Sequence, residues 1–361
     1  MHDDLNTAVR YHQSGHLEHA ARIYQAILSQ QPDHAEALHL LGVVALQHGN
    51  PPRALQLINR AIAVNPSVAA FHANLAEAYR AMGQAERAAG CCQVALRLQP
   101  EYPEAANNLG LAWLALGKLD AAALQFREAL RLRPGAPMVH NNLGNALRVA
   151  GDLDGAIAEL RQACALDPAL VFIHSNLGVA LMTRGDHRGA IAEFREALAL
   201  DGQDPDALNN LAWILATCAD PRLRDPEKAV AMARRAVALR PTNRGDWNTL
   251  GAAYYRYGEW KEAIEALERS MAMNRGGDSS DWFFLAMACW QMGRREDACR
   301  WYRQAVAWME KHAREDAELL RFRAEAAHLL GLPEREMLPK GSASGGRAPL
   351  PALGEREPSG S

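Results

Sequence analysis

The chain has 361 residues, of which 49% are hydrophobic, and its formal net charge is −3. That charge argues against the basic surface of a nucleic-acid-binding protein, and no apolar run in the sequence reaches the length of a membrane span. The first residues lack the basic and apolar regions of a signal peptide. We therefore expect no nucleic-acid or membrane partner and a cytoplasmic location.

The sequence contains a short motif, Asn-Leu followed by Gly or Ala, that returns every 34 residues. A fixed period of this size indicates a repeat array. Each unit predicts two helices, the first ending at a Gly in unit position 15 and the second ending near a Pro. The motif begins at Asn74, Asn108, Asn142, Asn176 and Asn210. The predicted units cover residues 1–34, 35–68, 69–102, 103–136, 137–170, 171–204, 205–243, 244–278 and 279–312.

Two unit positions hold small residues, which predicts close contact between the two helices of a repeat. Position 8 is Gly or Ala, and a larger residue at such a contact would be overpacked. The Gly at position 15 suits a left-handed residue after the first helix, and Asn50, Asp152 and Asp186, which directly follow it, can cap the second helix. Position 20 is Ala in all nine units: Ala20, Ala54, Ala88, Ala122, Ala156, Ala190, Ala229, Ala263 and Ala298.

Several segments depart from the regular unit. The first repeat is degenerate, with Thr7 in place of the usual Leu, as expected of a terminal unit. The seventh has five extra residues between its helices, and Pro221 and Pro226 predict a stiff loop there. Residues 313–332 predict a C-terminal capping helix that completes a domain of residues 1–332. Residues 333–361, rich in Pro, Gly, Ser and charge, predict a disordered tail.

This pattern resembles the tetratricopeptide repeat over roughly residues 1–312. The resemblance implies an all-α fold, a right-handed α-solenoid of about nine helix-turn-helix units whose first helices line a concave surface. Repeats two to six are similar to the array of O-GlcNAc transferases. Residues 211–270 are similar to arrays attached to bacterial serine/threonine kinases. Both resemblances concern non-catalytic parts of those proteins.

The five motif asparagines, Asn74, Asn108, Asn142, Asn176 and Asn210, occupy unit position 6, which points away from the partner helix and into the predicted groove. Asn is a poor helix former, but its amide can bond both the N–H and the C=O of an extended peptide. The O-GlcNAc transferase array has a similar asparagine ladder, which implies the same use. The alternative is a harmless polar residue inherited from a common unit, although position 5 varies meanwhile.

The sequence gives little sign of catalysis. It has no Gly-rich phosphate loop, no kinase catalytic loop and no Gly-x-Ser-x-Gly elbow, so we expect neither enzyme activity nor a cofactor. His72, His140 and His174 stand at position 4, where half-buried packing is favoured over a metal site. The adjacent Cys91 and Cys92 lack the C-x-x-C redox spacing.

The last third of the chain is rich in tryptophan, for which core packing is favoured over a patch that binds a partner. The sequence as a whole predicts a non-catalytic scaffold that binds proteins or peptides of extended conformation in its groove. Two alternatives stay open. The chain could be the substrate-recognition component of a glycosyltransferase or kinase system, or it could self-associate through exposed solenoid ends.

Overall fold

The computed structural model describes residues 2–273 and 276–332; the predicted tail, 333–361, lies outside these residues. Within them, all regular structure is helical, with 19 α-helices, one 3-10 helix and no strand. The prediction of an all-α solenoid is therefore confirmed. The chain divides into two compact units, Met1–Pro168 and Ala169–Ser361, which we describe separately.

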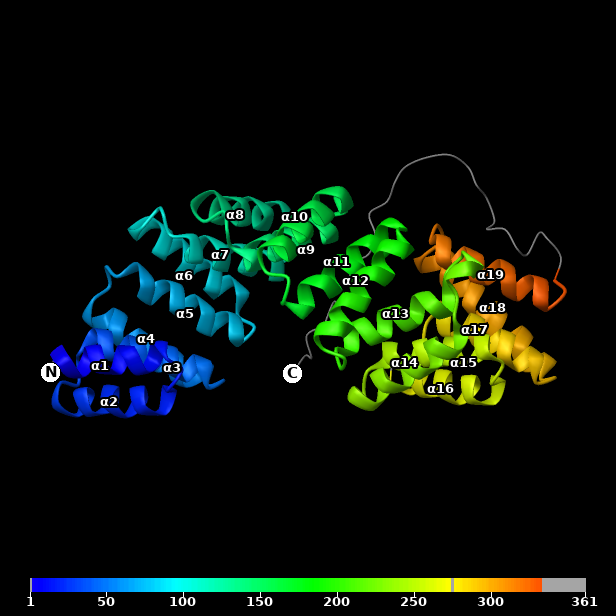
Figure 1. The fold of residues 1–361 in the computed structure, drawn as a ribbon, viewed down its shortest axis with the longest axis horizontal. Coiled ribbons are helices and arrows are strands. Elements are labelled where there is room, and N and C mark those ends of the chain that lie inside the picture. The colour runs from blue at the N-terminus through cyan, green and yellow to red at the C-terminus, as the bar shows by residue number, and fades with distance from the viewer. Residues whose placement is uncertain (1, 274–275, 333–361) are drawn as a thin grey trace. The chain divides into compact units, whose positions relative to one another are not determined.

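The helices of each unit follow one another with short connections (Figure 1). The first unit contains α1 (His2–Gln13), α2 (Leu17–Gln30), α3 (Ala35–Gln47), α4 (Pro51–Val64), α5 (Ala69–Ala81), α6 (Ala85–Leu98), α7 (Pro103–Ala115), α8 (Leu119–Leu132), α9 (Pro137–Ala150) and α10 (Leu153–Leu166). The second unit contains α11 (Val171–Arg184), α12 (His187–Leu200), α13 (Pro205–Thr217), η1 (Pro221–Leu223), α14 (Pro226–Leu239), α15 (Arg244–Tyr257), α16 (Trp260–Met273), α17 (Ser279–Gln291), α18 (Arg295–His312) and α19 (Ala317–Leu329).

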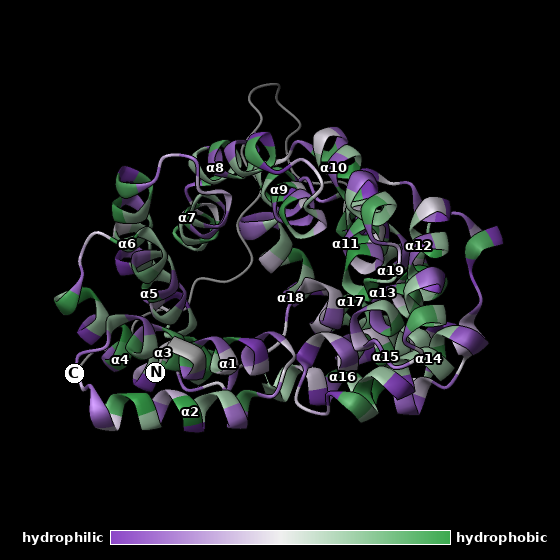
Figure 2. Cartoon of the chain, turned by 60° about the vertical axis from the view of Figure 1, so that its left-hand side comes forward, coloured by the Kyte–Doolittle hydropathy of each residue, from purple (hydrophilic) through white to green (hydrophobic). Residues whose placement is uncertain are grey.

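Each repeat is an antiparallel helix pair whose apolar stripe is covered by its own partner and by the next repeat. In both units the odd-numbered helix of a pair packs against the even-numbered helix that follows, and this second helix packs against the next first helix. Consecutive first helices also contact one another, as α5 contacts α7 and α13 contacts α15. Figure 2 shows the resulting pattern as hydrophobic and hydrophilic segments that alternate along the helices.

The small residues at position 8 lie where the two helices of a repeat come closest. A Cβ atom added to Gly144 on α9 would stand 2.7 Å from Leu160 Cγ and 3.1 Å from the carbonyl oxygen of Ala156, both on α10. At Gly110 the added atom would stand 2.6 Å from the Phe126 ring. These separations are too short for carbon atoms, so the predicted close approach at position 8 is confirmed.

Ala156 tests the same contact from the second helix. Its side chain is fully buried, so we expect Ala156→Leu to force α9 and α10 apart and lower the free energy of unfolding by about 1–3 kcal/mol. Ala158, exposed on the same helix, provides the matched control, because a larger side chain there does not have to fit a buried contact. Urea unfolding of both variants checks this, and an unchanged midpoint for Ala156→Leu would contradict the helix register.

The turn inside a repeat is fixed by a glycine and a helix cap. Gly151 has a φ of 89°, in the left-handed region that favours glycine. The next residue, Asp152, accepts a hydrogen bond from the backbone N–H of Gly155 at 3.0 Å and so caps α10. Both features were predicted from the sequence. They set the antiparallel arrangement that brings each first helix back to the same side of its unit.

The five-residue insertion of the seventh repeat forms a short ordered connection between α13 and α14. It contains the 3-10 helix η1, which Asp220 caps by accepting a hydrogen bond from the N–H of Arg222. Arg224 Nε donates to the carbonyl of Cys218 at 2.6 Å, and the N–H of Asp225 donates to the carbonyl of Leu215. The insertion is therefore held to the end of α13 and leaves the pairing of α13 with α14 intact.

Candidate functional site

The five predicted site asparagines all lie on first helices. Asn74 stands on α5, Asn108 on α7 and Asn142 on α9 in the first unit, whereas Asn176 on α11 and Asn210 on α13 belong to the second unit. All five are half-buried, in contrast to the core leucines that follow them. The asparagines are therefore neither core residues nor fully exposed ones, as a groove-lining position requires.

The amides of Asn74 and Asn142 also connect neighbouring repeats. Asn74 Nδ2 lies 2.7 Å from His39 Nε2, and Asn142 Nδ2 donates to Asn107 Oδ1 at 3.0 Å. In both pairs position 6 of one repeat contacts position 5 of the repeat before it. An amide offers two N–H donors and two acceptor sites, so each asparagine keeps most of its capacity for a ligand. Sequence reasoning missed these pairs, although a polar residue at position 5 could have indicated them.

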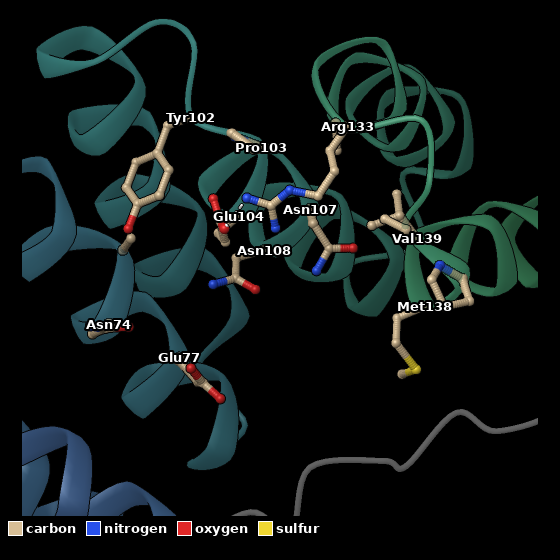
Figure 3. Close-up of a pocket in the computed structure, with 14 residues that line it drawn as sticks. Asn74, Glu77, Tyr102, Pro103, Glu104, Asn107, Asn108, Arg133, Met138 and Val139 are labelled. Carbon is tan, nitrogen blue, oxygen red and sulfur yellow. Dashed lines mark hydrogen bonds and ion pairs between the residues drawn. The ribbon is translucent and has the colours of Figure 1, made fainter. Parts of the chain in front are cut away.

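A cavity of about 450 Å³ opens between α5, α7 and the start of α9 (Figure 3). Asn74 and Asn108 line it together with residues of the connections that precede α7 and α9. Arg133 Nη2 lies 2.6 Å from Glu104 Oε1 across one wall. The remaining lining residues named in Figure 3 are Glu77, Tyr102, Pro103, Asn107, Met138 and Val139.

The cavity is lined by hydrogen-bonding groups and by carboxylates that have cationic partners. Glu104 is paired with Arg133, and Glu77 Oε1 lies 3.9 Å from Arg80 Nη2. Burial raises the pKa of Tyr102, with a smaller contribution from the charge of Glu104, so its hydroxyl stays protonated and can donate.

His39 supports this wall as a buried neutral ring. Its side chain is buried and its ring centroid lies 4.5 Å from that of Phe71. Burial, and to a lesser extent the nearby His12, lowers the pKa of His39 to about 4. The neutral ring can then accept the hydrogen bond that Asn74 donates, so the position of the Asn74 amide depends on an uncharged His39.

The lowered pKa of His39 makes stability depend on pH. Below its ordinary pKa of 6.5 the unfolded chain binds a proton that the folded chain does not bind until about pH 4. The free energy of unfolding should therefore fall by up to about 3 kcal/mol as the pH drops through this window. His39→Gln should remove this part of the pH dependence, whereas the exposed control His48→Gln should keep it. Urea unfolding across that pH range measures both, and equal pH profiles for the two variants would contradict the assignment.

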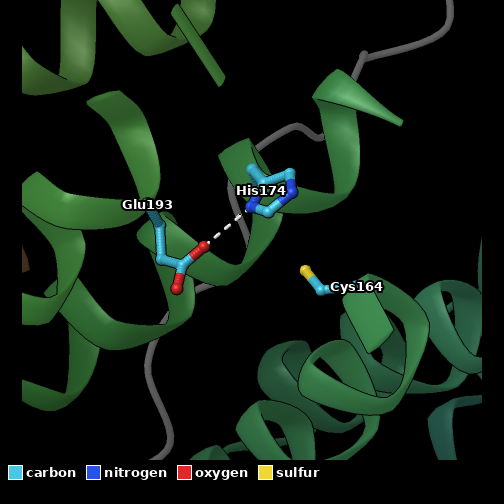
Figure 4. Close-up of side chains that lie close together, drawn as sticks. All are labelled: Cys164, His174 and Glu193. Atoms are coloured by element: carbon cyan, nitrogen blue, oxygen red, sulfur yellow. Dashed lines mark hydrogen bonds and ion pairs between the residues drawn. The ribbon is translucent and has the colours of Figure 1, made fainter. Parts of the chain in front are cut away.

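The histidines at position 4 serve the repeats themselves. His72 Nε2 lies 2.8 Å from the carbonyl oxygen of Pro66, and His140 Nε2 lies 3.0 Å from that of Pro134. His140 Nδ1 also lies 2.7 Å from Glu159 Oε2. The same pair recurs in the second unit, where His174 Nδ1 lies 2.8 Å from Glu193 Oε2 (Figure 4). These contacts favour a structural role for the position-4 histidines.

Tryptophans at position 4 make the equivalent contact. Trp247 Nε1 donates to the carbonyl of Pro241 at 2.9 Å, and Trp282 Nε1 donates to that of Gly276 at 2.8 Å. Trp282 is buried, and the Trp308 ring packs against it edge-on at 6.4 Å. Core packing therefore accounts for Trp282, whereas Trp247 is half-buried and its ring centroid lies 4.5 Å from the guanidinium carbon of Arg269. A ring N–H that binds the carbonyl six residues earlier is a feature that the apolar pattern alone did not reveal.

The family models agree with this architecture. A tetratricopeptide repeat model matches residues 5–69, 39–103, 73–137 and 175–217, and a TPR repeat model matches 144–185, so only residues 138–143 remain unmatched between 5 and 217. A further tetratricopeptide repeat model matches residues 282–304. The chain belongs to the tetratricopeptide repeat family. Its closer resemblance to the arrays of O-GlcNAc transferases and bacterial kinases stays a prediction.

Solved tetratricopeptide structures share the fold. The APC/C hetero-tetramer Cut9-Hcn1 aligns with a TM-score of 0.59 at 16% identity, over 86% of this chain and 60% of that chain. PilF of Pseudomonas aeruginosa aligns with a TM-score of 0.51 at 20% identity, over 59% of this chain and 94% of that chain. At these identities the likeness concerns the fold. No curated protein matches the sequence.

The helices of this tetratricopeptide array are short and amphipathic. In the part of the chain that the structure describes, none is both long and apolar enough to cross a bilayer.

Proposed function

We propose that the chain is a non-catalytic scaffold that binds extended polypeptide along the first helices of its repeats. Asn74, Asn108, Asn142, Asn176 and Asn210 are the contact residues, and the partners are other proteins or peptides. The observation that carries this proposal is the recurrence of one amide at one position of five first helices, two of which line a single cavity.

The chemistry of the lining supports an extended ligand. A peptide in extended conformation presents an unpaired N–H and C=O at each residue, and burying these groups without partners costs free energy. The Asn108 amide can satisfy one of each. Amides read the backbone and not the side chains, so the site would accept many sequences.

Site-specific photocrosslinking tests the location. Peptides selected from a random library on the full chain are the probe, and a photoreactive phenylalanine analogue replaces Tyr102 beside the cavity. The control places it at Leu124, which is 61% exposed on the second helix α8. We expect crosslinked peptide from position 102 and little from position 124. Equal yields from the two positions would contradict a groove site.

A further inference from the structure

The last described helix, α19, contacts the first helices of the seventh, eighth and ninth repeats. Phe322 of α19 is fully buried, with its ring 4.9 Å from that of Phe284 on α17 and 6.0 Å from that of Trp213 on α13. The helix also packs against α18, which precedes it. Figure 1 shows α19 alongside α17 and α18. The chain thus covers this part of its own first-helix face with a helix.

Polar contacts fix the register of α19 on this face. Glu325 forms an ion pair with Arg256 of α15, with Arg256 Nη2 donating to Glu325 Oε2 at 2.6 Å. Near the other end of α19, Trp213 Nε1 donates to Glu318 Oε1 at 3.2 Å, and Arg321 donates to the carbonyl of Thr217. Arg256 is only 10% exposed, and a cation so little exposed needs a carboxylate partner.

The three main contact residues form one stripe of α19. Glu318, Phe322 and Glu325 are spaced i, i+4 and i+7, which places them on the same side of a helix. The stripe reads acid, aromatic, acid, and it meets an indole N–H, an aromatic cluster and a guanidinium in the same order. This is the arrangement of a helix recognised in a groove.

The residue type at unit position 6 changes in the repeats that α19 covers. The asparagine ladder ends with Asn210 in the seventh repeat, and the eighth and ninth repeats carry Thr249 and Phe284 at that position. Both are buried, and Phe284 is the residue that contacts Phe322. An amide that suits a peptide backbone has been replaced by a ring that suits an apolar side chain.

We infer that the first-helix face of α13, α15 and α17 is a binding site for an amphipathic helix of a partner protein carrying an acid-x-x-x-aromatic-x-x-acid stripe, and that α19 occupies this site in cis. The inference goes beyond the proposed function, because it concerns a helical ligand and residues that the asparagine groove of the first unit does not include.

An open space beside α19 would let a partner helix make contacts that α19 does not make. A cavity of about 390 Å³ borders the first turn of α19 and is lined by Asn210, Asn248, Trp308 and Glu318 among others. The face is therefore longer than the helix that covers it. A partner helix that extends beyond the position of Glu318 would contact Asn210 and Trp308 as well. Only such a difference in contacts lets a ligand displace a resident segment.

The tether explains why the site would be masked in the wild-type chain. A segment joined by a short connection reaches its site at an effective concentration of the order of millimolar. An added peptide of the same sequence must compete with it, and its apparent affinity falls by the fraction of chains whose site is open.

A charge-swap experiment on the full chain tests the inference. The probes are fluorescent peptides of residues 314–332, one with the natural sequence and one with Glu325→Arg. In the full-length variant Arg256→Glu, the cis helix faces a carboxylate and should release. This variant should bind the Glu325→Arg peptide at least about 10²-fold more tightly than the wild-type chain binds the natural peptide. It should bind the natural peptide weakly.

Lys261→Glu, an equal charge change at a 73% exposed residue of α16, is the matched control and should bind neither peptide. The full-length variant Glu318→Ala/Phe322→Ala, which weakens α19 but keeps Arg256, should bind the natural peptide. Circular dichroism confirms that each variant is folded.

Failure of both opened variants to bind their peptides, or equal binding of the two peptides by Arg256→Glu, would overturn the inference. A wild-type dimer that Arg256→Glu converts to a monomer would also overturn it, since the occupant would then be a second copy of the chain.

Discussion

Replacing Arg240 by Met should lower the free energy of unfolding by about 3–5 kcal/mol, because it leaves a buried carboxylate without its cation. Arg240 follows α14 and donates to Asp246 of α15 through Nη2 at 2.9 Å and Nε at 3.0 Å. Its Nη1 donates to Asp206 of α13 at 2.6 Å. Asp246 is only 1% exposed, so solvent screens its charge poorly once the guanidinium is removed. Urea unfolding of the variant measures the loss.

Two further variants separate the unpaired charge from lost packing. Arg240→Met/Asp246→Asn should recover much of the stability, because the buried charge is gone. Asp206→Ala should cost less than about 1 kcal/mol, since Asp206 is 66% exposed. Burial raises the pKa of Asp246 even beside Arg240. A raised folded-state pKa gives stability that is present at low pH and lost as pH rises. Arg240 lowers the pKa of Asp246, so this pKa should rise further in Arg240→Met. The loss of unfolding free energy caused by Arg240→Met should therefore shrink on acidification. A deficit that persists in the double variant would contradict this account.

The repeated features of the fold could be predicted because each depends on contacts within one repeat. The spacing between Gly144 and Leu160, or between Gly151 and the α10 cap Asp152, is fixed by the 34-residue period and returns in other units. A small residue at a close approach and a glycine at positive φ have few substitutes. The identity of a residue and its position in the unit were therefore enough to predict both features.

The features that the sequence did not reveal join distant or chemically variable residues. The contact of Trp213 with Glu318 spans 105 residues and involves one non-repeated helix, so no period indicates it. The pairing of Asn74 with His39 uses a position whose residue type changes from repeat to repeat. Periodicity identifies which face a residue occupies, but it does not say which polar atoms meet on that face.

Replacing Asn74, Asn108 and Asn142 together by Ala should weaken peptide binding by about tenfold to a thousandfold. Each lost amide contact should contribute about 0.5–1.5 kcal/mol to this loss. The peptide is one selected on the wild-type full chain, and isothermal titration calorimetry gives its affinity. The control triple, Arg127→Ala, Arg161→Ala and Arg195→Ala, changes exposed residues at one position of three second helices. It should leave the affinity nearly unchanged.

The single variants show whether binding and stability can be separated. Asn142→Ala loses the bond to Asn107, which costs about 0.5–1.5 kcal/mol of stability, against several tenths regained from helix propensity. Asn108 lines the cavity, and Asn108→Ala gains helix propensity in the same way. It should therefore be as stable as the wild type, or more stable, and still bind more weakly. If Asn108→Ala binds as well as the wild type, or if it unfolds more easily with no change in affinity, then the ladder is structural and the peptide site lies elsewhere.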